Sequence, residues 1–180
     1  NRGSRMSGEG LRQDWAGSDV QIARQNPDDV PEAFNDARNF ADSVQTENPG
    51  APVSYTGHSL GGAEAQYQAA TLGGNATTFG APGVRFAVSD EQARAAEGRV
   101  TNFVLPGDPV PLSGQHVGQT VMLTPSGGTI AKDIAAVGIG LAVGGLVGLV
   151  IALAGVAATH MLGNYIDALA GMAMPPMPSV

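Results

Sequence analysis

Apolar side chains recur every three or four residues between positions 28 and 48, and polar side chains fill the positions between them. This spacing predicts an amphipathic helix with one apolar face. Asp28 or Asp29 is expected to cap it, Pro31 to occupy its first turn, and the Asn-Pro-Gly run at 48–50 to end it. The predicted apolar face comprises Val30, Ala33, Phe34, Ala37, Phe40, Ala41 and Val44.

Short apolar runs and helical patterns alternate over the residues that follow. Strands are predicted at 52–56, 75–83 and 99–105, and helices at 61–72 and 89–98. Such alternation is typical of an α/β fold with a mostly parallel sheet flanked by helices.

A long apolar segment, "IAAVGIGLAVGGLVGLVIALAGVAA", occupies residues 134–158. It has no charge and no hydrogen-bonding side chain, and it exceeds the roughly 20 residues that a helix needs to span a bilayer. Its glycines at 140, 144 and 148 also suit close helix pairing in lipid. Hydropathy alone would make it a transmembrane helix.

The amino-acid composition argues against several classes of function. A length of 180 residues favours a single domain over 1–180. The net charge is −7 and the basic residues form no stripe, so no nucleic-acid partner is expected. The chain has no cysteine and only three dispersed histidines, which predicts no metal site.

The pentapeptide "GHSLG" at 57–61 lies between a predicted strand and a predicted helix. This context favours a nucleophilic serine, Ser59, held in a strained turn with its hydroxyl exposed. Gly57 and Gly61 are expected to let the strand and the helix approach closely. The N–H group of Leu60 is expected to point where an oxyanion forms.

A nucleophilic serine needs a base and an acid that orients the base. Asp108 directly follows the third predicted strand, at the edge where open α/β sheets place their sites, and it is the preferred acid. Asp90 and Asp133 are rivals. Asp90 fits the first turn of a helix better, and Asp133 immediately precedes the apolar segment.

Several motifs occur in an order that resembles the class 3 lipases of the α/β-hydrolase fold. They are "NRGS" at the start, "YTGHSLGGAEAQ", "TTFGAPGV", "VTNFVLPGDPVPL" and "HVGQTVML", and they cover roughly residues 1–125. The resemblance implies a serine hydrolase that cleaves carboxylic esters of lipids through an acyl-enzyme, without a cofactor. By this resemblance Ser59 is the nucleophile, Asp108 is the acid, and Ser4 with Leu60 forms the oxyanion hole.

Two features depart from that family. The family carries further strands before the Arg-Gly-Thr/Ser element, so the chain is expected to be a fragment that lacks an N-terminal segment or is completed by a partner chain. The apolar segment 134–158 stands where the family has a loop leading to its histidine. It forms an apolar, glycine-rich insertion before the last catalytic element.

The three histidines are the candidates for the base. His58 precedes the nucleophile and is a supporting residue in the family. The order Ser–Asp–His holds for both His116 and His160, so order alone leaves the choice open. The resemblance favours His160, because the family often shows a later histidine followed by a tyrosine, as in His160–Tyr165. His116 is the second candidate.

The choice of His160 constrains the apolar segment. A single membrane crossing would put Ser59 and His160 on opposite sides of a hydrocarbon layer about 30 Å thick. The chain is therefore expected to double back near Gly144-Gly145 and form a lid over Ser59, in contact with lipid. The alternative is that 134–158 simply fills the core.

Other readings of the whole chain stay open. One alternative is that the hydrolase-like part is an inactive scaffold for a membrane-inserting or binding module. The other is that the chain is a non-lipid esterase or an acyltransferase, because a fold does not determine a substrate. The expected partners are a lipid ester and a membrane or lipid surface. The location is open, with a secreted or membrane-associated protein favoured.

Overall fold

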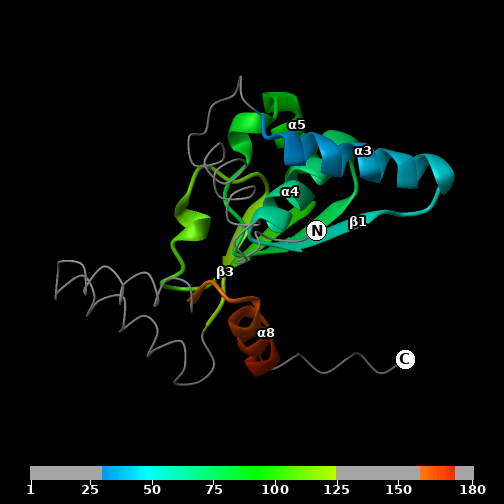
Figure 1. Cartoon of the computed structure of the whole chain (residues 1–180). Helices are drawn as coiled ribbons and strands as arrows, with labels where there is room; N and C mark the ends of the chain where they lie inside the picture. Colours follow the sequence, from blue (N-terminus) through cyan, green and yellow to red (C-terminus); the bar gives the residue numbers. More distant parts are fainter. Residues whose placement is uncertain (1–29, 125–158, 173–180) are drawn as a thin grey trace, which may run out of the picture. The chain divides into compact units, whose positions relative to one another are not determined.

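The computed structural model describes residues 30–124 and 159–172 (Figure 1). The chain divides into two compact units. Unit 1 comprises Asn1–Val104 and Pro109–Val121, and unit 2 comprises Leu105–Asp108 and Met122–Val180. The predictions for Ser4, Asp133 and the segment 134–158 fall outside the described residues.

A four-stranded sheet of order β1-β2-β3-β4 organises unit 1. Its strands are β1 (Ser54–His58), β2 (Asn75–Phe79), β3 (Val100–Val104) and β4 (Gln119–Met122). The pairs β1–β2 and β2–β3 are parallel, with Ser54 opposite Asn75 and Ala76 opposite Val100. The α/β fold class with a parallel sheet and flanking helices is thereby confirmed.

Helices connect the parallel strands. The helix α3 (Glu32–Glu47) precedes β1, α4 (Leu60–Leu72) joins β1 to β2, and α5 (Asp90–Ala96) joins β2 to β3. Because parallel crossovers are right-handed and the strand order runs in one direction, α4 and α5 lie on the same face of the sheet. There α4 packs on β1 and β2, while α3 and α5 pack against α4 (Figure 1).

The core of unit 1 lies between α4, α3 and the sheet. The Phe34 ring of α3 is fully buried and lies 5.2 Å, centroid to centroid, from the Tyr67 ring of α4. Small side chains of α4 face this core, which lets the helix lie close to the strands. The main buried members are Phe34, Ala41, Tyr55, Leu60, Ala63, Ala65, Tyr67, Ala69, Ala76, Val84, Val100 and Val117.

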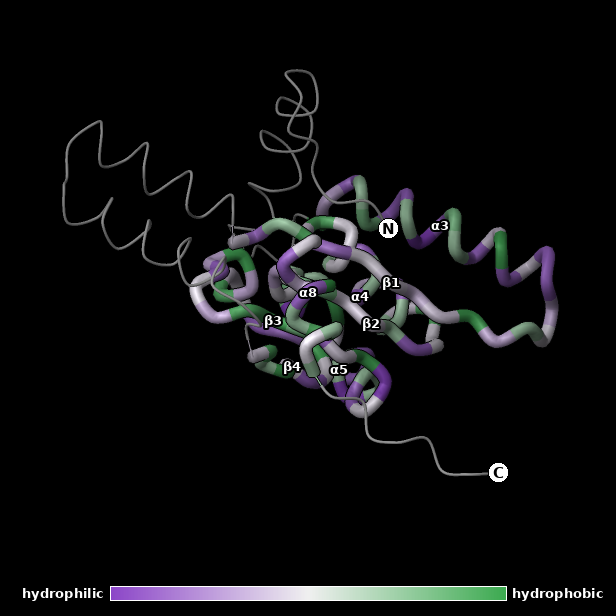
Figure 2. The backbone as a smooth tube through the Cα atoms, turned by 90° about the horizontal axis from the view of Figure 1, so that it is seen from below, coloured by the Kyte–Doolittle hydropathy of each residue, from purple (hydrophilic) through white to green (hydrophobic). Residues whose placement is uncertain are grey.

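Two expectations for α3 are corrected. The N-cap of α3 is Pro31, which has an extended backbone with ψ 137°, so the predicted cap at Asp28 or Asp29 is wrong. Phe40 is 69% exposed, because the buried face of α3 contains only Phe34 and Ala41. Figure 2 shows hydrophobic and hydrophilic residues alternating along this helix.

The strand boundaries also differ from the predicted ones. The first strand begins at Ser54 and extends to His58, and the second ends at Phe79 rather than at 83. The second strand stops because Gly80 has a φ of 56° and Pro82 cannot donate a ladder hydrogen bond. The helices and the third strand match their predicted positions more closely.

Unit 2 contributes the helix α8 (Leu162–Gly171), with Tyr165 and Ala168 fully buried. These two residues are one turn apart and so share one helix face. Within residues 30–124 and 159–172, every helix is too short or too polar to cross a membrane.

The helix α4 can lie close to β1 because two residues at their contact are glycines, which have no side chain. A Cβ atom on Gly57 would lie 2.0 Å from the carbonyl oxygen of Gly61, and one on Gly62 would lie 2.7 Å from the Cβ of Ala81. The prediction that glycine permits a close strand–helix contact is therefore confirmed for Gly57, and the structure adds Gly62 as a second position of this kind.

Replacing Gly57 by alanine is expected to destabilise the fold by at least about 3 kcal/mol, the upper end of the usual cost of overpacking. The backbone of α4 has to move, because the clashing atom is a main-chain oxygen. Urea unfolding of the variant measures the effect. Gly163→Ala is the matched control, since nothing lies within 4 Å of a Cβ built there. Equal stability of Gly57→Ala and wild type would contradict the close-contact interpretation.

Candidate active site

Ser59 lies in the turn between β1 and α4, where it is the N-cap residue of the helix. Its backbone has φ 57° and ψ −129°, and it is the one non-glycine residue with a positive φ in the described parts of the chain. This conformation costs about 1–3 kcal/mol, and such strain is concentrated at functional sites. The predicted strained backbone at Ser59 is confirmed.

The start of α4 supplies backbone donors beside Ser59. The N–H groups of Gly62 and Ala63 donate to the carbonyl oxygen of Ser59 at 2.9 and 3.1 Å. Leu60 is the first residue of the helix, so its N–H group has no acceptor within the helix. Together with the positive end of the helix dipole, this N–H suits the stabilisation of an oxyanion. Ser4, the predicted second donor, is outside the described residues.

Asp108 ends a tight turn that begins directly after β3. Pro106 presets the turn, Gly107 has a φ of 85°, and the N–H of Asp108 donates to the carbonyl oxygen of Leu105 at 3.2 Å. Proline followed by a glycine with positive φ is the signature of a type II turn. The turn buries the carboxylate of Asp108, whose side chain is 0% exposed.

Two side chains of unit 2 hydrogen-bond to the same carboxylate oxygen. Nδ1 of His160 lies 2.8 Å from Oδ2 of Asp108. The hydroxyl of Tyr165, on α8, donates to that same Oδ2. Next to His160, the hydroxyl of the buried Thr159 donates to the carbonyl oxygen of Gly107 at 3.5 Å. The structure thus brings together two predicted site residues, Asp108 and His160, and adds Tyr165.

The contact with Asp108 determines the tautomer of His160. A carboxylate only accepts, so Nδ1 carries a proton, and Nε2 holds the lone pair of the neutral ring. The His160 side chain is 18% exposed, unlike the fully enclosed carboxylate behind it. A histidine oriented by a buried acid and reachable from outside is equipped for general-base chemistry.

His116, the second candidate base, has structural partners. Its Nε2 lies 2.7 Å from the carbonyl oxygen of Pro111 and therefore donates to it. Its Nδ1 then accepts from Nδ2 of Asn102 at 3.4 Å. Both ring nitrogens thus bind groups of unit 1, and proton transfer at either one would break a hydrogen bond.

The contact with His116 ends a buried polar chain that crosses the sheet. Gln66 donates to the hydroxyl of Thr78 at 3.2 Å, and Thr78 donates to Oδ1 of Asn102 at 3.0 Å. The side chain of Asn102 also bonds both the N–H and the carbonyl of Ala81. These hydrogen bonds fix the position of Ala81, the residue that packs against Gly62 of α4.

The remaining sequence candidates have other positions. Asp90 occupies the first turn of α5, as expected, and forms an ion pair with Arg85. His58 is the last residue of β1, directly before Ser59. Ser59 belongs to unit 1, whereas Asp108 and His160 belong to unit 2.

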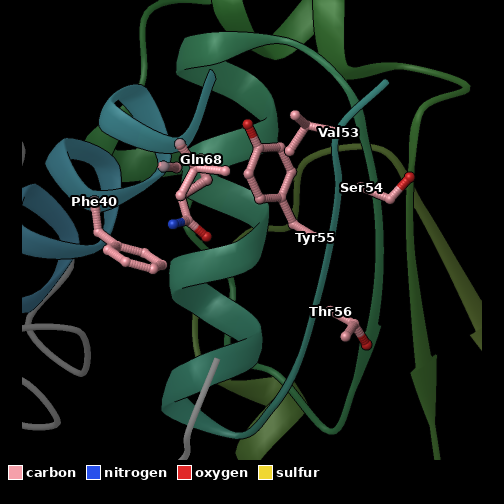
Figure 3. A pocket seen from close by; sticks show the side chains of 8 residues that line it. Phe40, Val53, Ser54, Tyr55, Thr56 and Gln68 are labelled. Atoms are coloured by element: carbon pink, nitrogen blue, oxygen red, sulfur yellow. The ribbon is translucent and has the colours of Figure 1, made fainter. Parts of the chain in front are cut away.

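A cavity of about 260 Å³ opens in unit 1 between α3, α4 and β1. Figure 3 shows Phe40, Tyr55 and Gln68 at this cavity, with Ser54 and Thr56 pointing away from Tyr55. None of the candidate catalytic residues lines it. Within the described residues, no three acidic or histidine side chains lie close enough together to hold a metal ion.

Sequence reasoning missed the contribution of Tyr165 to the carboxylate and the role of Asn102. The sequence shows the spacing from His160 to Tyr165, but this spacing entered only through the resemblance to the class 3 lipases and gave Tyr165 no role of its own. Asn102 could have been noticed as an amide within the strand "RVTNFVL", because a buried polar side chain requires hydrogen-bond partners.

A comparison with protein families finds one described as phospholipase-like, the Tle-like phospholipase domain, whose model matches residues 2–161. No curated protein sequence matches the chain. The family match supports the lipase or phospholipase side of the resemblance, whereas membership of the class 3 lipases stays a prediction. The chain belongs to the phospholipase-like family of the Tle-like phospholipase domain, whose general function is lipid hydrolysis.

Proposed function

We propose that the chain is a serine hydrolase that cleaves carboxylic esters of lipids, as a lipase or a phospholipase of the A type. The observation that carries the proposal is the hydrogen bond between His160 and the buried carboxylate of Asp108. The strained turn at Ser59 supports a nucleophile at the start of α4. The phospholipase-like family supports a lipid substrate.

In the proposed reaction, Oγ of Ser59 attacks the ester carbonyl carbon while Nε2 of His160 takes the hydroxyl proton. The bond to the alcohol then breaks, and His160 returns the proton to the leaving oxygen. Water cleaves the acyl-enzyme in the same way, with His160 taking a proton from the water and returning it to Ser59. Asp108 keeps His160 in the required tautomer. No metal or cofactor takes part.

The N–H of Leu60 donates to the oxyanion of each tetrahedral intermediate in this proposal. Ser4 is proposed as the second donor, from its position in the "RGS" run. The segment 134–158 is proposed as an apolar lid that contacts lipid, because its length and composition suit an interfacial element.

A lipid surface is the proposed partner of unit 2. Four large apolar side chains at α8 and its two ends are exposed to solvent, and two of them immediately follow His160. Moving exposed apolar groups of this kind from water into the boundary between lipid headgroups and acyl chains lowers the free energy. The four residues are Met161, Leu162, Ile166 and Met172.

A short-chain esterase or acyltransferase is the competing activity, because the same three residues serve both reactions. A series of esters with increasing acyl length separates the two. Rising kcat/KM with chain length and with aggregated substrate supports the lipase, whereas a preference for small soluble esters supports the alternative. Absence of any ester hydrolysis by the chain in its full natural context would favour an inactive scaffold.

Ser59→Ala is expected to reduce ester hydrolysis by about three to six orders of magnitude, because no other group forms the acyl-enzyme. A fluorophosphonate probe should label Ser59 in the wild-type protein, as located by mass spectrometry of peptides. Ser43→Ala is the matched control, since Ser43 is exposed on α3 and bonds only the local carbonyl of Phe40. Activity of Ser59→Ala within twofold of wild type would refute the proposal.

His160→Ala is expected to abolish turnover, with a loss of about 10³-fold or more. His116→Ala should keep activity within about fivefold but lower the stability by about 1–3 kcal/mol, because Asn102 and Pro111 lose a part-buried hydrogen-bond partner. Initial rates and urea midpoints of both variants provide the test. The reverse pattern of activities would assign the base to His116.

Leu162→Glu and Ile166→Glu are expected to lower hydrolysis of phosphatidylcholine vesicles by about tenfold, because each charge opposes entry into the lipid boundary. Hydrolysis of a soluble short-chain ester should stay within twofold. Phe40→Glu is the control, as a similar change at an exposed aromatic residue of α3. An equal loss with both substrates would exclude a specific role in lipid contact.

A further inference from the structure

The carboxyl group of Asp108 is buried, and its described neighbours in unit 2 carry no positive side chain of lysine or arginine. These described residues of unit 2 are 105–108, 122–124 and 159–172. A buried carboxylate is costly unless donors surround it. Hydrogen-bond donors are therefore needed to stabilise a carboxylate at this position.

The hydroxyl of Tyr165 is one of these donors, and its orientation is determined from two sides. The backbone N–H of Leu105 donates to the hydroxyl oxygen, and the hydroxyl in turn donates to Oδ2 of Asp108. Leu105 begins the turn that ends at Asp108, so the tyrosine bonds both ends of the same turn. A hydroxyl that accepts on one side has its proton directed to the other.

Tyr165 lies on the buried face of α8. Its side chain is fully buried, and it shares the buried face of the helix with Ala168. Burial, followed by the charge of Asp108 and the hydrogen bond to it, raises the pKa of Tyr165 far above its ordinary value. The phenol consequently stays protonated and remains a donor throughout the pH range of an enzyme assay.

Tyr165 and His160 share one oxygen atom, Oδ2. A donor on that oxygen withdraws electron density from it and limits how strongly it attracts the Nδ1 proton of His160. The same bond prevents the carboxylate from rotating away from the imidazole. A charge-assisted bond of this kind is about twice as strong as a neutral one.

We infer that Tyr165 is a positioning residue of the catalytic site, which holds the carboxylate of Asp108 in the orientation that His160 requires. The inference rests on the proposed function of Asp108 and His160. Tyr165 itself does not touch the substrate in this scheme. It acts on the reaction only through Asp108.

Tyr165→Phe in the full chain removes the hydroxyl and retains the ring. It is expected to lower kcat by about 10- to 100-fold, the effect of losing one hydrogen bond to a charged group, with KM within about twofold. In the Asp108→Asn background the same change should cost less than about threefold, because its target is already altered. Tyr55→Phe is the matched control, since its hydroxyl accepts one hydrogen bond, from Gln45, outside the site.

A spectroscopic measurement tests the contact between Tyr165 and Asp108 without an assay of enzyme activity. The Nδ1 proton of His160 should give a low-field proton NMR signal that is absent in His160→Ala. The signal should move downfield in Tyr165→Phe, because Oδ2 then attracts the proton more strongly, and it should stay in place in Tyr55→Phe. If Tyr165→Phe does not fold, wild-type chain with 3-fluorotyrosine provides the test, since a more acidic phenol should move the signal upfield.

Unchanged kcat together with an unmoved signal would overturn the inference, as would an equal loss of kcat in the Asp108→Asn background. The two proposals fail in distinguishable ways. Full activity of Ser59→Ala would reject the serine mechanism, whereas the NMR shift would still report whether Tyr165 acts on the Asp108–His160 pair.

Discussion

The contact between the end of β1 and the start of α4 is the constraint on which the architecture of unit 1 depends. The chain reverses within one residue, Ser59, whose positive φ is unfavourable for any side chain. The packing around it maintains this conformation. Gly57 lies against the carbonyl of Gly61, and Gly62 lies against Ala81, so bulkier residues would separate the helix from the sheet. The same turn places the half-buried Ser59 beside the N–H group of Leu60, the first residue of α4.

The buried polar chain extends that constraint across the sheet. Asn102 bonds both backbone groups of Ala81, and Ala81 is the residue that abuts Gly62. Thr78 and Gln66 connect the amide back to α4, which closes a loop of contacts around the turn. His116 completes the hydrogen bonds of Asn102 and is thereby occupied in maintaining the structure.

Most of the element order could be predicted, because hydrophobic periodicity and glycine positions are local signals. The boundaries were less accurate. Phe40 fits the helical repeat of α3 but is exposed, since the partner helix covers only the face that contains Phe34 and Ala41. The second strand ends early at Gly80, where backbone conformation outweighs the β propensity of the flanking residues.

The sequence by itself determined that a serine stands between a strand and a helix, flanked by glycines, and that an aspartate follows a later strand. Those features depend on neighbours within a few residues. Only the tertiary structure decided which histidine meets Asp108, because His160 is 52 residues away along the chain. It also revealed Tyr165 on the same carboxylate oxygen. A buried charge selects its donors by position in space, and that position depends on how the whole chain packs.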